Sequence, residues 1–135
     1  MNDLAIRYAF AFLATQAIEV PIYVRGPLRA MPIRRALVLA FGASLLTHPM
    51  AALGLPWLVA HLVEKPIFVP GHTALDAAFG LRVLVHGLAS EGFAVLGEAL
   101  YLRLLGVRRP LAWSLLANGA SVTVGAILTL TTGFP

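Results

Sequence analysis

Three of the six acidic residues of this 135-residue chain lie inside long apolar stretches of its sequence. They are Glu19, Glu91 and Glu98. A carboxylate inside a bilayer costs about 2.5–3.5 kcal/mol even on insertion scales, so it usually faces a protein interior and has a partner there. We therefore predict that the three glutamates form a buried site that handles protons or cations.

The apolar stretches also place other polar side chains at overlapping depths. If each stretch is an α-helix across a membrane, Glu19 lies about 8 Å from one boundary of the membrane core, and Glu98 and Asn118 lie about 10 Å from it. Ser121 and His48 lie roughly 15–18 Å from the same boundary. The predicted proton or cation site therefore contains five residues: Glu19, His48, Glu91, Glu98 and Asn118.

Three more polar residues are predicted to support this site, namely Gln16, Tyr101 and Ser121. Gln16 lies about one helical turn from Glu19. Tyr101 lies one turn from Glu98, which is close enough for a hydrogen bond between the two side chains.

The same residues leave two other functions open. Two carboxylates and an imidazole suit iron, manganese or zinc, so Glu19, His48 and Glu98 are candidate ligands of a divalent metal cofactor. The chain would then be an intramembrane metal-dependent enzyme, with Asn118 orienting the substrate. Alternatively, the polar groups only specify helix packing, at about 0.6 kcal/mol per interhelical hydrogen bond. The chain would then be a structural or assembly subunit.

Three further histidines lie near the opposite boundary of the membrane core, namely His61, His72 and His86. Neutral imidazole is the commonest metal ligand, so an outer metal or haem site is one interpretation. Unconnected interfacial histidines are the other, because the sequence contains no H-x-x-x-H or E-x-x-H pair.

Four apolar stretches must position these side chains, and each is close to the roughly 20 residues that cross a bilayer. They cover about residues 4–24, 36–62, 81–105 and 111–132. The motif Thr73-x-x-Asp76 resembles a capping signal, which predicts that the third helix begins near Ala74. The sequence thus predicts an all-α protein, a single four-helix transmembrane bundle over residues 1–135.

The basic residues predict its orientation. Seven of the ten lie in the loops that follow the first and third stretches. Short loops rich in Lys and Arg stay on the cytoplasmic side, so both termini are predicted on the outer side of the plasma (inner) membrane of a multi-pass protein.

The composition excludes several other classes of protein. Only 12% of the residues are charged, about half the usual share of a soluble domain, which argues against a water-soluble single domain. Low charge and high apolar content also exclude intrinsic disorder. No basic face interleaved with exposed aromatic residues remains for nucleic acid, so the expected partner is the lipid bilayer. The absence of cysteine excludes a thiol nucleophile and a Cys-ligated iron–sulfur cluster.

Small residues recur at fourth-residue spacing and predict how the helices pack. One row runs from Ala40 through Ser44 to His48, and another from Ala117 through Ser121 to Gly125. Such rows allow close backbone approach, so we expect them to face inward. Four short spans enclose little volume, which favours a homo-oligomer or a subunit of a larger membrane complex.

Four short motifs, taken together, resemble a pattern in small four-span prokaryotic membrane proteins of unassigned function. The motifs are Glu19-Val20-Pro21, Thr47-His48-Pro49, Glu91-x6-Glu98 and Ala117-Asn118-x-x-Ser121. The resemblance covers most of the chain. It implies a four-span fold and brings no activity with it.

Overall fold

All regular elements of the described part of the chain are helical. The computed structural model describes residues 3–54 and 72–133, and these contain no strand. Four α-helices and one π-helical turn follow in this order: α1 (Asp3–Arg25), α2 (Ile33–Pro49), η1 (Met50–Gly54), α4 (His72–Leu104) and α5 (Pro110–Thr132). The predicted all-helical fold class is confirmed for these residues.

The helix ends follow the prolines and glycines of the sequence. α1 and α5 begin and end within one residue of the predicted stretches 4–24 and 111–132. α2 ends earlier than the predicted stretch 36–62, because Pro49 lacks the N–H that continues an α-helical ladder, and the π-helical turn η1 follows directly. Residues 55–62 of that prediction lie outside the described residues.

The third helix is longer than the predicted span of 81–105. α4 begins at His72, two residues before the predicted Ala74, and ends at Leu104. After it, Gly106 has a φ of +76° and the Val107 N–H donates to the Leu102 carbonyl at 3.0 Å. This is the left-handed glycine termination of a helix, which turns the chain toward α5.

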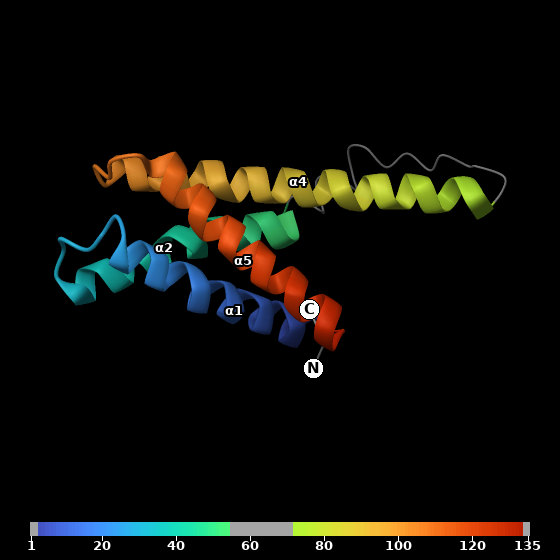
Figure 1. Cartoon of the computed structure of the whole chain (residues 1–135), viewed down its shortest axis with the longest axis horizontal. Helices are drawn as coiled ribbons and strands as arrows, with labels where there is room; N and C mark the ends of the chain where they lie inside the picture. Colours follow the sequence, from blue (N-terminus) through green and yellow to red (C-terminus); the bar gives the residue numbers. More distant parts are fainter. Residues whose placement is uncertain (1–2, 55–71, 134–135) are drawn as a thin grey trace.

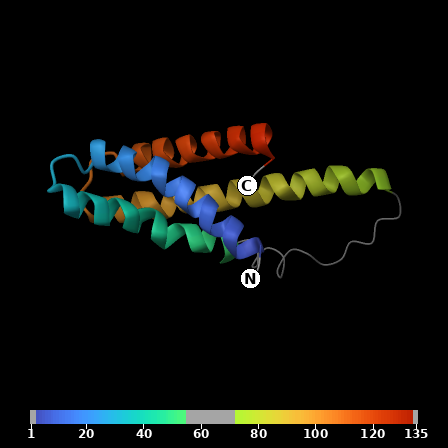
Figure 2. The ribbon, with the colours of Figure 1, turned by 90° about the horizontal axis from the view of Figure 1, so that it is seen from below.

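The four helices contact one another in the cyclic order α1, α2, α4, α5, and back to α1. α4 extends well beyond the other three, and α5 diverges from α4 as it runs away from the end of that helix (Figures 1 and 2). The middle of α5 contacts α1, where Ser121 donates to Glu19. The loops of residues 26–32 and 105–109 lie together at one end of the molecule, which we call the loop end (Figure 1).

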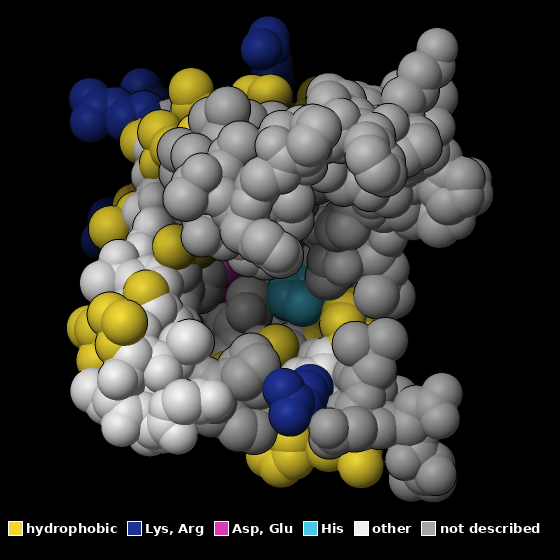
Figure 3. All heavy atoms as spheres, turned by 90° about the vertical axis from the view of Figure 1, so that its right-hand side faces the viewer, with side chains coloured by type: hydrophobic (Ala, Val, Ile, Leu, Met, Phe, Trp, Pro, Cys, Tyr) yellow, Lys and Arg dark blue, Asp and Glu magenta, His cyan; other side chains and the backbone are white. Residues whose placement is uncertain are grey.

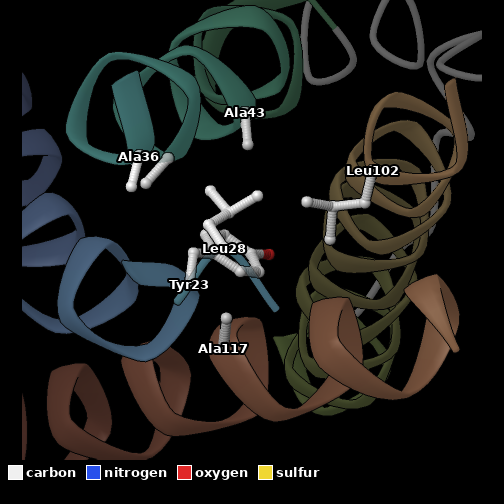
Figure 4. Packing of buried hydrophobic residues seen from close by; sticks show 7 residues of the cluster. Tyr23, Leu28, Ala36, Ala43, Leu102 and Ala117 are labelled. Atoms are coloured by element: carbon white, nitrogen blue, oxygen red, sulfur yellow. The ribbon is translucent and has the colours of Figure 1, made fainter. Parts of the chain in front are cut away.

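Small side chains and one inserted leucine form the apolar core near the loop end. Leu28 of the first loop is fully buried between the helices, and it belongs to one cluster with Tyr23, Leu102 and four alanines (Figure 4). The Leu28 N–H donates to the Tyr23 carbonyl at 3.0 Å, which holds the loop against the end of α1. We call Tyr23, Leu28 and Leu102 the apolar layer, because they close the interior on this side.

The predicted rows of small residues are only partly inside. Ala40, Ser44 and Ala117 are buried, whereas Gly125 and the residues that follow it on α5 are exposed. The reason is the direction of α5, which packs on α4 near the loop end and then diverges from it (Figure 1).

Only α5 among the described helices is both long and apolar enough to cross a membrane by itself. α2, with 17 residues, is about 25 Å long, shorter than the roughly 30 Å of a bilayer core.

Candidate functional site

Glu98 lies at the centre of a group of hydrogen-bond donors from three other helices. Its Oε2 accepts from the Tyr23 hydroxyl, from Asn118 Nδ2 at 2.7 Å and from Ser114 Oγ at 3.5 Å. Its Oε1 accepts from Thr47 Oγ1 at 3.2 Å. The side chain is 1% exposed, so these neutral groups replace water around the carboxyl.

Glu19 has a simpler environment made of two serines. Its Oε2 accepts from the Ser44 hydroxyl, and its Oε1 accepts from Ser121 Oγ at 2.8 Å. Ser121 Oγ also lies 3.0 Å from the Asn118 carbonyl, and Asn118 Nδ2 donates to Glu98 at 2.7 Å, so Asn118 connects the two carboxyls. Glu19 is also 1% exposed. The two buried carboxyls therefore belong to one connected polar cluster.

Helical spacing explains how each helix presents its part of this cluster. On α1, Glu19 and Tyr23 are four residues apart and share a face. On α2, Ser44 and Thr47 are three residues apart and are both buried. On α5, Asn118 is buried and its Nδ2 also donates to the Ser114 carbonyl at 3.0 Å. Each helix thus turns polar side chains inward, and most of the large apolar side chains of the described residues lie outside.

A cavity of about 280 Å³ extends from the two carboxyls toward the end opposite the loops. Its wall includes Glu19, Glu98, His48, Glu91 and Ser90. Figure 3 shows the molecule from that end, where a histidine and part of an acidic side chain lie inside a hollow. The structure therefore places all three predicted glutamates and the predicted histidine on one cavity, although Glu91 is exposed while Glu19 and Glu98 are buried.

His48 has an unusual environment within this cavity wall. Its ring lies edge-on to the rings of Tyr8 and Phe12, with centroid distances of 5.5 and 5.1 Å. Its Nδ1 is buried and has no hydrogen-bond partner in the described part of the chain. The imidazole is held by aromatic contacts and keeps a nitrogen available for a further partner.

The three supporting residues predicted from the sequence differ in what their side chains contact. Ser121 bonds Glu19, as described above. Gln16 is buried on α1, but its Nε2 and Oε1 have no hydrogen-bond partner among the described residues. The tyrosine that donates to Glu98 is Tyr23, whereas the Tyr101 hydroxyl lies against Gly42, 3.1 Å from the position of an added Cβ.

Sequence reasoning missed four members of the cluster, namely Tyr23, Ser44, Thr47 and Ser114. Ser44 was expected only as a small residue on an inward face. The helical spacing contained a signal for two of them: Tyr23 lies four residues after Glu19, and Ser114 lies four residues before Asn118. Thr47 gave no such signal, because its Oγ1 can also bond to carbonyls of its own helix, here that of Ala43 at 3.3 Å.

The predicted metal ligands Glu19, His48 and Glu98 all line the cavity. Among the side chains that the structure describes, no three His, Asp or Glu residues are grouped so that they could hold a metal ion. His61 lies outside the described residues, as do the side chains of His72 and His86, so the outer histidine site stays a prediction.

Comparisons of the chain with protein-family models, with curated proteins and with solved structures found no match. The four-motif resemblance noted from the sequence therefore carries no activity or family residue onto this site. Any function must be argued from the carboxyl cluster and its surroundings.

Proposed function

We propose that the chain is a multi-pass plasma-membrane protein in which Glu19 and Glu98, with His48 and Glu91, handle protons or cations. It does so alone as an oligomer or as a subunit of a larger membrane complex. The observation that carries this proposal is the pair of buried carboxyls, each bonded only by neutral side chains and both on one cavity. A buried carboxyl with neutral partners is costly as packing alone.

The distribution of polar and apolar side chains supports a membrane environment. In the described part of the chain, seven of the sixteen buried residues are polar or charged. The outer surfaces carry many exposed large apolar side chains, including Phe10 and Leu13 on α1, Val38 and Leu46 on α2, and Leu130 on α5. A soluble protein buries such side chains, whereas a protein in lipid has no hydrophobic reason to do so. We therefore propose a four-helix transmembrane bundle with the loop end on the cytoplasmic side and both termini outside.

The hydrogen-bond pattern favours protons over metal cations at this site. The oxygens of Glu98 and Glu19 already accept from side-chain donors, so few lone pairs remain for a cation that needs several oxygen ligands. Hydroxyl groups, in contrast, can donate to a carboxylate and accept from a carboxylic acid. The serines around Glu19 can thus accommodate both protonation states by rotating.

The cavity opens toward the end opposite the loops (Figure 3). It reaches Glu19 and Glu98 from the end opposite the loops, and the apolar layer of Tyr23, Leu28 and Leu102 closes the other side. A proton that enters from the cavity can therefore bind at the carboxyls. Release of the proton to the loop end requires the apolar layer to open. We propose that contact with a second copy or a partner subunit opens it.

The same network supports a structural function as the second candidate. Glu98 receives bonds from α1, α2 and α5 at once, so it links all four helices. A purely structural protein would tolerate the amide in place of either carboxyl wherever its hydrogen bonds are kept.

Proton flux into liposomes distinguishes these functions. The purified protein is reconstituted with an internal pH dye, and an imposed potential drives uptake. We expect flux in the wild type and a loss of about tenfold or more in Glu19→Gln. Glu64→Gln, outside the predicted spans, is the matched control and should keep the wild-type rate.

Other results would overturn the proposal. Wild-type flux unchanged in the Glu19→Gln/Glu98→Gln double variant would leave only the structural function. Absence of proton and cation flux from a correctly folded wild type would contradict this function for the isolated protein. Stoichiometric metal in the purified protein, lost in Glu98→Gln, would favour the metal-dependent enzyme instead.

A further inference from the structure

A second cavity lies at the loop end, away from the carboxyl cluster. It measures about 430 Å³ and lies between the loop of residues 26–32 and the loop of residues 105–109. Three arginines line it, Arg25, Arg29 and Arg108, together with the ring of Trp113. The rest of the wall is formed by backbone and apolar side chains.

The charge around this cavity is of one sign. None of its described lining residues is acidic. The sequence also has no acidic residue between Glu19 and Glu64 and none after Glu98, so neither loop carries a carboxylate. Guanidinium groups without carboxylate neighbours bind phosphate groups well, because their planar forks match phosphate oxygens.

The apolar part of the wall is held in place by close packing. Trp113 lies so near Gly26 that a Cβ at that position would be 2.5 Å from the ring. Glycine is therefore required there, and the indole has a fixed position beside the arginines. A wall with three arginines among mostly apolar residues suits an amphipathic ligand better than a free ion.

We propose that this basic cavity binds the phosphate of an anionic phospholipid headgroup, with Trp113 beside the glycerol part of the lipid. The choice of a lipid rests on the proposed membrane placement, in which the loop end lies at the cytoplasmic headgroup layer. Basic pockets between helices on that side are suited to anionic headgroups, and Trp is favoured at this interface.

Trp113 provides the readout for a direct test. Trp57 is first replaced by Phe, which leaves Trp113 as the single tryptophan. The protein is placed in phosphatidylcholine vesicles that contain brominated phosphatidylglycerol or, separately, brominated phosphatidylcholine, and quenching is followed. We expect half-maximal quenching at roughly tenfold lower mole fraction for the anionic lipid.

Two matched triple variants separate a cavity from general surface charge. Arg25→Gln/Arg29→Gln/Arg108→Gln should reduce the preference to about twofold or less. The control removes three charges that do not line the cavity, in a variant with Arg34→Gln, Arg35→Gln and Arg103→Gln. It should keep the preference, and circular dichroism should show the same helix content in both.

Three outcomes would overturn the proposal. Equal loss in both triple variants would mean surface charge without a site. No preference for the anionic lipid in the wild type would mean no lipid binding. Loss of the preference when phosphate replaces chloride at equal ionic strength would identify free phosphate as the ligand. None of these readings depends on proton flux, so this inference and the proposed function can fail separately.

Discussion

The two buried glutamates have different hydrogen-bond partners. The donors to Glu98 are the Asn118 amide and three hydroxyls, including that of Tyr23. Around Glu19, both partners are serine hydroxyls. One region thus contains a group that can only donate, and the other contains only groups that can both donate and accept.

This difference assigns different roles to the two carboxyls. The Asn118 NH₂ group can only donate, so it favours a Glu98 oxygen that stays an acceptor. Ser121 Oγ lies 2.8 Å from Glu19 Oε1 and 3.0 Å from the Asn118 carbonyl, so its single proton can go to either. We infer that Glu98 is the fixed carboxyl that organises the helices and that Glu19 is the one that exchanges protons.

The largest effect on stability is expected from removing Glu98. Glu98→Ala leaves the buried Tyr23 hydroxyl without its acceptor and removes three other hydrogen bonds, so it should lower the free energy of unfolding by about 3 kcal/mol. Glu19→Ala should cost about 1 kcal/mol, because two bonds are lost and Ser121 still has a backbone acceptor. Unfolding in mixed micelles with increasing denaturing detergent measures both, and equal costs would remove the distinction between the two regions.

A methyl group at Gly97 should disturb the Glu98 region next most strongly. Its Cβ would lie 2.8 Å from Thr47 Cγ2, and Thr47 donates to Glu98, so Gly97→Ala should destabilise by about 1–2 kcal/mol. Gly92→Ala on the same helix is the control, because nothing lies within 4 Å of that position. There the gain in helix propensity should leave stability unchanged or slightly higher. Similar losses in both variants would contradict the packing described here.

Replacing the phenol should have a smaller effect that identifies which tyrosine matters. Tyr23→Phe removes one donor to Glu98 and should cost about 1 kcal/mol in the same unfolding measurement. Tyr101→Phe should cost less, about 0.5 kcal/mol or below, because Tyr101 is only half-buried and lies against Gly42. The reverse order would return the role to Tyr101.

The smallest stability effect is expected beside Glu19. Ser121→Ala should cost about 0.5 kcal/mol, since interhelical hydrogen bonds in membranes are weak on average. The same variant should nevertheless slow proton flux, because one of the two reversible hydroxyls is lost. Wild-type flux in Ser121→Ala would show that the hydroxyls have no part in proton exchange.

The fold was predictable where the signals are local. Prolines and arginines bound the apolar stretches, so the limits of α1 and α5 follow from the sequence within one residue. The end of α2 was missed because Pro49 is followed by a π-helical turn rather than by a simple kink.

The candidate site was predictable in depth and not in detail. A fixed rise per residue places Glu19, Glu98 and Asn118 at similar levels, and the structure brings them together. Glu91 lies two turns from Glu98 on the same side of α4, yet it is exposed, because α5 diverges from α4 (Figure 1). Rotation and crossing angle come from side-chain packing over the whole molecule, which spacing along one helix does not contain.

Infrared spectroscopy tests the central claim, proton exchange at Glu19, most directly. The pH-difference spectrum of the reconstituted protein should contain a carboxylic acid C=O band that shifts in D₂O. We predict that this band disappears in Glu19→Gln and persists in Glu98→Gln. A band that disappears only in Glu98→Gln would contradict proton exchange at Glu19. So would a wild-type spectrum whose only pH-dependent carboxyl band is lost in Glu64→Gln, because that band belongs to a surface group.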